Sequence, residues 1–185
     1  IPAPSTANTS ALSFANELGV RYSEGLYKNP FIGRTFIMPG NDERKKSVRY
    51  KLVPQEFEIR GKDVLIMDDS IVRGNTSREI VRMVREFGAE KVYFISACPP
   101  VKFPCYYGVD MPTRGELTAA NKSIDEIKEF MKVDILMYQD MDDLKEAVTR
   151  KGDHNIDRPC MACLDGWYVN GNINEQKMDD IENQR

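Results

Sequence analysis

The sequence predicts an α/β fold in which a mostly parallel sheet is flanked by helices. The first observation is the apolar run at residues 64–67, which is typical of a strand that is buried on both faces. Apolar residues then recur with helical spacing at Ile80, Met83, Val84 and Phe87, and a second apolar run follows at residues 92–97. Strand, helix and strand in this order form a βαβ unit, whose two strands run parallel.

The other elements follow from similar local patterns. Residues 8–18 are rich in Ala and Leu and precede Gly19, which predicts a helix that ends at this glycine. Residues 25–40 combine glycines, prolines and aromatic residues, so short strands and turns are expected there. Later in the chain the patterns predict a helix, a strand and a helix, at residues 124–131, 135–138 and 144–150.

Length and composition limit the classes of protein that are possible. The 185 residues suit one domain, expected at residues 1–150, followed by a polar tail at residues 151–185 that something other than a core holds in place. A hydrophobic content of 41% excludes wholesale disorder. A net charge of -3 gives no global attraction to nucleic acid, and no apolar run is long enough to span a membrane. We expect a cytoplasmic protein, and the start at Ile1 predicts a piece of a longer chain.

The residues after the first predicted strand have the chemistry of a sugar-phosphate site. Asp68 and Asp69 lie at the carboxyl end of this strand, where they could accept hydrogen bonds from vicinal hydroxyls or hold magnesium. Gly74 then precedes a predicted helix, whose first backbone N–H groups would point at an anion. Any short part of this sequence could be a simple turn with a helix cap. The whole sequence, from the apolar run through the acidic pair to the start of the helix, is far more specific for a ligand site.

These residues resemble a known family. The string VLIMDDSIVRGNTS, residues 64–77, resembles the phosphoribosyl-pyrophosphate (PRPP) signature of the type I phosphoribosyltransferases. Segments 25–37, 44–52 and 103–110 narrow the resemblance to the glutamine PRPP amidotransferases, over about residues 2–169. The resemblance implies the type I phosphoribosyltransferase fold with a mobile loop. It also implies that PRPP and ammonia from glutamine give 5-phosphoribosylamine and pyrophosphate, the first step of purine synthesis.

The resemblance also implies roles for particular residues. Asp68 and Asp69 match the acidic pair that engages the ribose hydroxyls and Mg²⁺, Thr6 matches a third metal position, and Lys51 matches a basic residue that meets the pyrophosphate. We therefore expect Lys51, Asp68 and Asp69 to be the catalytic residues. The remaining residues expected to bind PRPP, most of them in the loop that holds its 5-phosphate, are Ser70, Arg73, Gly74, Asn75, Thr76 and Ser77.

Other interpretations and two departures from the family stay open. A solvated helix face is the alternative for Lys51, and a helix cap is the alternative for Thr6. In the loop expected to close over the substrate, residues 28–38 and those after it, Pro30 and Phe31 replace a basic residue and a tyrosine. Asn75 stands where threonine is common, which removes a hydroxyl but leaves the backbone donor.

The cysteines suggest a second site. Cys105, Cys160 and Cys163 match three ligands of the [4Fe-4S] cluster that some family members carry, in which the fourth ligand lies upstream of residue 1. The alternatives are a buried thiol for Cys105 and a zinc site for the CxxC pair. Cys98 is expected to be a small core residue, although it could replace the fourth ligand. His154, the single histidine, is assigned no role.

The resemblance implies partners as well. The family has an amino-terminal glutaminase domain with a terminal cysteine nucleophile, which this sequence lacks. The expected partners are PRPP, glutamine-derived ammonia, that glutaminase domain and purine nucleotide feedback inhibitors, and we expect a homo-oligomer. Two alternatives remain: a salvage phosphoribosyltransferase that acts on a nucleobase, and a regulatory module that senses PRPP without turnover.

Overall fold

The computed structural model describes residues 1–31, 51–149, 158–171, 173 and 175–182. Several predictions lie outside these residues. They are most of the expected mobile loop, the basic residues 44–49, His154 and the expected domain boundary near residue 150. The elements are α1 (Asn8–Leu18), β1 (Leu26–Lys28), β2 (Leu52–Pro54), α3 (Glu56–Ile59), β3 (Asp63–Asp68), α4 (Asn75–Glu86), β4 (Lys91–Ser96), η2 (Arg114–Glu116), α5 (Thr118–Asn121), α6 (Ile124–Met131), β5 (Ile135–Tyr138), α7 (Met141–Thr149), α8 (Ala162–Asp165) and α9 (Glu175–Glu182).

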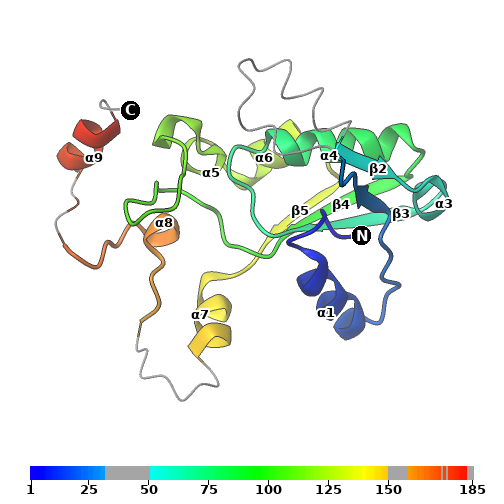
Figure 1. Ribbon diagram of the computed structural model, residues 1–185, viewed down its shortest axis with the longest axis horizontal. Coiled ribbons are helices and arrows are strands. Elements are labelled where there is room, and N and C mark those ends of the chain that lie inside the picture. The colour runs from blue at the N-terminus through cyan, green and yellow to red at the C-terminus, as the bar shows by residue number, and fades with distance from the viewer. Residues whose placement is uncertain (32–50, 150–157, 172, 174, 183–185) are drawn as a thin grey trace.

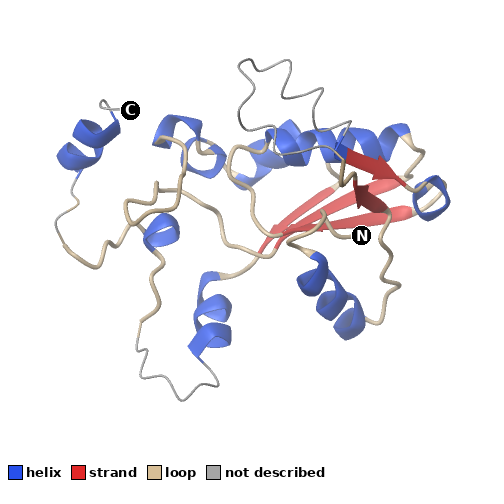
Figure 2. Cartoon of the chain, viewed as in Figure 1, coloured by secondary structure: helices blue, strands red, loops and turns tan. Residues whose placement is uncertain are grey.

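A three-stranded parallel sheet in the order β3-β4-β5 forms the centre of the described structure (Figures 1 and 2). Its register places Asp68, Ser96 and Tyr138 side by side at the carboxyl ends of the strands. A separate antiparallel pair, β1 and β2, lies beside it. The prediction of an α/β fold with a mostly parallel sheet and flanking helices is therefore confirmed.

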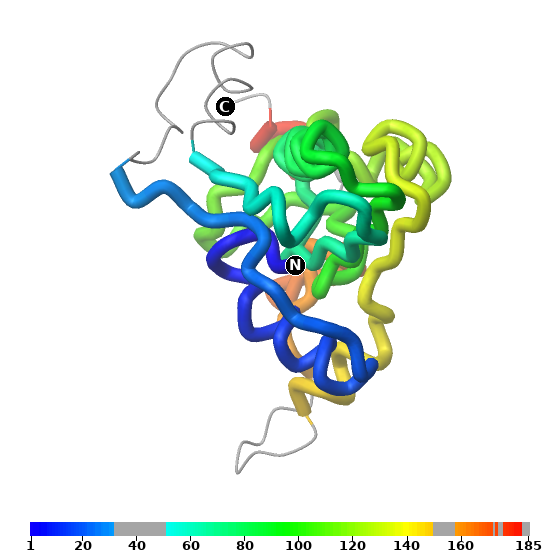
Figure 3. The backbone as a smooth tube through the Cα atoms, turned by 90° about the vertical axis from the view of Figure 1, so that its right-hand side faces the viewer, coloured from blue at the N-terminus to red at the C-terminus, as the bar shows by residue number. Residues whose placement is uncertain are grey.

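Helices cover both faces of the sheet. Because alternate side chains of a strand point to opposite faces, each face presents apolar side chains that pack against a helix. On one face, Ile66 and Phe94 pack in a core with residues of α4 and α6. On the other face, Met67 and Ile95 pack against Ala11 of α1. The two side views agree: α1 lies on the side of the sheet opposite α4 (Figures 1 and 3).

The first residues of the chain extend the sheet beyond β3. Met67 N donates to Ile1 O at 3.0 Å, and Ala3 N donates to Met67 O at 2.7 Å. Pro2 forms a parallel bridge with Met67, so this segment runs in the same direction as β3. It therefore carries the following residues, including Thr6, past the carboxyl end of β3.

The C-terminal region differs from the prediction of a tail without a core. Met161 and Leu164 are buried in a cluster with Val101 and Leu117. Tyr168 and Met178 are buried in another cluster with Ala162. Among the residues after 157 that the structure describes, apolar packing therefore contributes to holding the segment. No helix in the described ranges is long and apolar enough to cross a bilayer.

Candidate active site

The acidic pair lies where the fold exposes the end of a buried strand. Asp68 is the last residue of β3, and its carbonyl oxygen accepts a hydrogen bond from Ala97 N at 2.9 Å. Asp69 N donates to Asp68 Oδ1 at 2.9 Å, and Ser70 Oγ donates to Asp69 Oδ1 at 3.2 Å. The two carboxylates are therefore adjacent at the carboxyl edge of the sheet, with Ser70 beside them.

The electrostatics of the pair suit a cation. Burial, and then the negative charge of Asp69, raise the pKa of Asp68 from 3.8 to about 7. A magnesium ion prefers oxygen ligands, and its positive charge would offset the cost of ionising a half-buried carboxyl group. The donor chemistry of Asp68 and Asp69 thus fits the Mg²⁺ that the resemblance implies.

The turn that follows the acidic pair depends on Gly74. This glycine is buried and has a left-handed backbone, with φ of 71°. A Cβ atom added there would lie 3.3 Å from Thr118 Oγ1 and 3.4 Å from the Phe130 ring. Both the conformation and the lack of space therefore favour glycine at the start of α4.

The first turn of α4 presents backbone donors. Arg78 N donates to Gly74 O at 2.9 Å, which is the first hydrogen bond of the helix ladder. The preceding N–H groups, those of Asn75, Thr76 and Ser77, have no helical acceptor at i−4. Because the positive end of the helix dipole lies there as well, this terminus has the properties of a phosphate site.

The side chains of this turn do not all face solvent. Asn75 and Thr76 are exposed, whereas Ser77 is 3% exposed and belongs to the buried stripe of α4 that includes Ile80 and Val84. The hydroxyl of Ser77 therefore faces the interior. Only the backbone N–H of Ser77 remains available to a ligand at the helix terminus.

Two residues that the sequence analysis missed lie against the turn. The Arg73 guanidinium pairs with Glu116, with Nε 3.1 Å from Oε1. Thr118 N donates to Val72 O at 2.9 Å. No local pattern links residues so far apart in the sequence, and only the position of η2 and α5 beside the turn reveals them.

Lys51 and Thr6 come from other elements. Lys51 immediately precedes β2, and its carbonyl oxygen accepts from Asn29 N at 2.6 Å. Burial, and then the charge of Lys28, lower the pKa of Lys51. Thr6 is exposed and lies between the segment paired with β3 and the start of α1. Thr6 therefore lies near the edge that carries the acidic pair, whereas Lys51 lies next to β2 of the other sheet.

The predicted cluster cysteines lie on neighbouring segments. Lys102 N and Phe103 N both donate to Cys163 O at 3.0 Å, which ties the segment before Cys105 to the CxxC pair. Burial, and then the charge of Cys105, raise the pKa of the Cys163 thiol. However, no three His, Cys, Asp or Glu side chains among the described residues are grouped as metal ligands.

Cys98 lies in an apolar environment. It packs with Cys163 against the cluster that contains Val101 and Met161. Burial raises the pKa of the Cys98 thiol to about 11, so this thiol is protonated at neutral pH. This environment agrees with the expected role of a small core residue.

Two relatives with similar sequences are both amidophosphoribosyltransferases. The chain is 51% identical over 185 residues to an amidophosphoribosyltransferase of Pseudomonas aeruginosa, covering 100% of the chain and 37% of that relative. It is 44% identical over 185 residues to the Escherichia coli amidophosphoribosyltransferase, covering 100% of the chain and 36% of the relative. The predicted resemblance to the amidophosphoribosyltransferases is confirmed. No family model matches the chain.

Solved structures agree with this resemblance. The fold matches the glutamine PRPP amidotransferase from B. subtilis, complexed with ADP and GMP, with a TM-score of 0.78 and 39% identity. The match covers 91% of this chain and 37% of the B. subtilis chain. The chain thus spans a little over a third of the length of the amidophosphoribosyltransferases it matches.

Proposed function

We propose that the chain transfers the phosphoribosyl group of PRPP to ammonia derived from glutamine, giving 5-phosphoribosylamine and pyrophosphate. The observation that carries this proposal is the adjacency of the Asp68–Asp69 pair and the amino terminus of α4 at one edge of the sheet. The two carboxylates suit the ribose hydroxyls, and the helix amino terminus suits the 5-phosphate. The amidophosphoribosyltransferase relatives and their place in purine biosynthesis support the choice of reaction.

In this proposal the residues hold the sugar at two points. Asp68 and Asp69 accept hydrogen bonds from the ribose hydroxyls, and the N–H groups of residues 75–77 bind the 5-phosphate. Holding both ends keeps the anomeric carbon in place for attack by ammonia. When bound at the acidic pair, Mg²⁺ supplies positive charge that stabilises the departing pyrophosphate. Lys51 adds positive charge for the same group.

The wider assignments rest on the relatives. We infer a phosphoribosyltransferase domain at residues 1–150 and a C-terminal segment at residues 151–185, in a cytoplasmic homo-oligomer that works with a glutaminase domain. Purine nucleotides are the proposed feedback inhibitors, because the B. subtilis structure is described as a complex with ADP and GMP. Gel filtration with light scattering measures the subunit number.

The iron–sulfur cluster stays a prediction from the resemblance. The proximity of the Cys105 segment to Cys163 supports it. We assign the cluster no step in the reaction. Iron and acid-labile sulfide are the quantities to measure in purified protein. Zinc without sulfide would favour a zinc site at the CxxC pair.

The function is tested by adding PRPP, Mg²⁺ and ammonium to the purified protein and measuring pyrophosphate. Release that requires ammonium is expected. Release that requires a purine or pyrimidine base instead would identify a salvage enzyme. Binding of PRPP without release under any acceptor would identify a regulatory module.

A further inference from the structure

Arg73, in the middle of the expected phosphate turn, is already engaged by a carboxylate. Its Nε donates to Glu116 Oε1 at 3.1 Å and its Nη2 donates to Oε2 at 3.3 Å, which makes a bidentate pair across 43 residues of sequence. The hydrogen bond from Arg73 lowers the pKa of Glu116, so the carboxylate is ionised at neutral pH. The Nε–Nη2 edge of the guanidinium is therefore directed at Glu116.

The backbone on either side of Arg73 is held by the same neighbouring segment. Thr118 N donates to Val72 O at 2.9 Å. Thr118 is buried, and its hydroxyl limits the space around Gly74, where an added Cβ would lie 3.3 Å away. Residues 116–118 thus contact the turn at Val72, Arg73 and Gly74, immediately before the N–H groups of α4.

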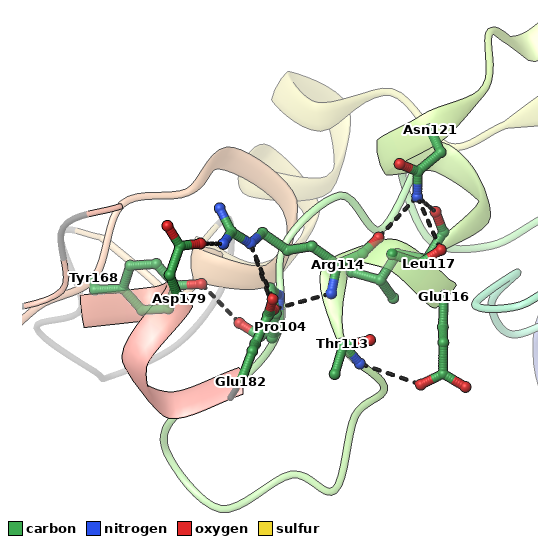
Figure 4. A network of polar contacts seen from close by, with 10 residues as sticks. Pro104, Thr113, Arg114, Glu116, Leu117, Asn121, Tyr168, Asp179 and Glu182 are labelled. Atoms are coloured by element: carbon green, nitrogen blue, oxygen red, sulfur yellow. Dashed lines mark hydrogen bonds and ion pairs between the residues drawn. The ribbon is translucent and has the colours of Figure 1, made fainter. Parts of the chain in front are cut away.

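Glu116 is itself held in place by a network of polar contacts (Figure 4). Thr113 N donates to Glu116 Oε2 at 3.4 Å, in a capping box that starts η2. Asn121 Nδ2 donates to the carbonyl oxygens of Arg114 at 2.8 Å and Leu117 at 2.9 Å. Arg114 N donates to Glu182 of α9 at 2.9 Å. Glu116 therefore lies on a segment that several independent hydrogen bonds hold in place.

We propose that Glu116 is a positioning residue for the phosphate turn: it holds Arg73 on the outside of the turn, so that the backbone N–H groups after Gly74, rather than the guanidinium, bind the 5-phosphate. This inference rests on the proposed function and refines it. An exposed ion pair adds little to the stability of the fold. A turn that is already ordered before the phosphate arrives, however, binds it with a smaller entropic cost.

The first test replaces the charge and keeps the shape. Glu116→Gln retains an oxygen that can accept from Thr113 but loses the ion pair. We expect calorimetry to show ribose 5-phosphate binding about fivefold weaker, the size of effect that one exposed ion pair can exert. The KM for PRPP should rise by a similar factor while kcat stays within about twofold. Inorganic pyrophosphate binding and the unfolding temperature should not change.

A matched control separates this effect from a general loss of surface charge. Glu86→Gln removes an exposed ion pair with Arg82 at the C-terminal end of α4, away from the turn. We expect this variant to bind ribose 5-phosphate as the unchanged protein does. Wild-type affinity in Glu116→Gln would overturn the inference, and so would an equal loss of pyrophosphate binding, which would indicate a general structural defect.

The second test reverses the pair. Arg73→Glu alone should weaken ribose 5-phosphate binding, and adding Glu116→Arg should restore most of it, because the pair then re-forms with its charges exchanged. If the double variant binds no better than Arg73→Glu, the guanidinium acts on the phosphate directly and the inference is wrong. Failure of the proposed function has a different signature: the unchanged protein itself would bind neither ribose 5-phosphate nor PRPP.

Discussion

The acidic pair with its phosphate turn and the cysteine region are built in different ways. The first occupies residues 68–77, a continuous segment that begins at the end of β3, where six residues of the strand are in register with β4. The second brings together residues near 105 and near 160–163, through bonds such as those from Lys102 N and Phe103 N to Cys163 O. A site made from one segment keeps its geometry through local sequence, whereas a site made from distant segments depends on how each of them packs.

The comparison predicts that changes at the acidic pair have the largest effect and act on activity. Asp68→Asn with Asp69→Asn removes both negative charges that are proposed to hold the ribose and Mg²⁺. We expect pyrophosphate release to fall by at least about 1,000-fold, comparable to the loss of a principal electrostatic group in an active site. Circular dichroism should show an unchanged fold. Turnover within about tenfold of the unchanged protein would contradict the site assignment.

The second prediction concerns the stability of the same region. The pKa of Asp68 is raised to about 7, from an ordinary value of 3.8, mainly by burial. Because the folded state then binds its proton more tightly than the unfolded state, stability falls as the pH rises from about 4 to about 7. Asp68→Asn should therefore increase the free energy of unfolding at pH 8, without Mg²⁺ or PRPP, by up to about 4 kcal/mol.

Urea unfolding at pH 4 and pH 8 measures this difference. The gain from Asp68→Asn should be near zero at pH 4 and largest at pH 8. Asp142→Asn is a suitable control, since the side chain of Asp142 is 89% exposed on α7. Equal stability of Asp68→Asn and the unchanged protein at pH 8 would mean that ionisation of Asp68 costs nothing in the fold.

A smaller effect is expected at the phosphate turn. Gly74→Ala places a side chain at a φ of 71° and 3.3 Å from Thr118 Oγ1. The strained backbone should cost about 1–2 kcal/mol in the free energy of unfolding and weaken ribose 5-phosphate binding. Gly115→Ala, which has no heavy atom within 4 Å of the added Cβ, should change neither. Similar stabilities of the two variants in urea would count against the conformational requirement at Gly74.

The smallest effect is expected in the cysteine region. Tyr168 is buried, and its hydroxyl donates to Pro104 O at 2.7 Å, next to Cys105. Tyr168→Phe should lower the free energy of unfolding by about 1 kcal/mol, the net contribution of one such hydrogen bond. Tyr107→Phe, at an exposed ring whose hydroxyl accepts from Asn170 N at 3.3 Å, should cost less.

PRPP binding by the Tyr168→Phe variant tests whether the cysteine region and the phosphate turn are independent. If they are independent, Tyr168→Phe should leave PRPP affinity unchanged, as measured by calorimetry. A loss of PRPP affinity in Tyr168→Phe would show that the cysteine region supports the phosphate turn after all.

Much of the fold follows from local patterns in the sequence. The bounds predicted for α1, α6 and β5 are those observed, because apolar spacing and end signals such as Gly19 act within a few residues. The start of α7 was predicted at residue 144, but the helix begins at Met141. Asp140 Oδ1 accepts from Asp142 N at 2.8 Å and from Asp143 N at 3.2 Å, a helix cap that the apolar pattern does not register.

The residues that surround the site depend on contacts between distant segments. Glu116 and Thr118 reach Arg73 and Val72 only because η2 and α5 fold back beside the turn. The buried position of Ser77 likewise follows from the packing of α4 on the sheet, which the motif alone does not show. The order of acids, glycine and helix was predictable, but the environment of each side chain was not.

A crystal structure with ribose 5-phosphate and Mg²⁺ tests the central claim most directly. We predict the phosphate within hydrogen-bonding distance of the backbone N–H groups of residues 75–77, and the ribose hydroxyls beside Asp68 and Asp69. Arg73 should remain paired with Glu116. A sugar phosphate bound at another edge of the sheet, or a phosphate that contacts no N–H group at the start of α4, would contradict the account.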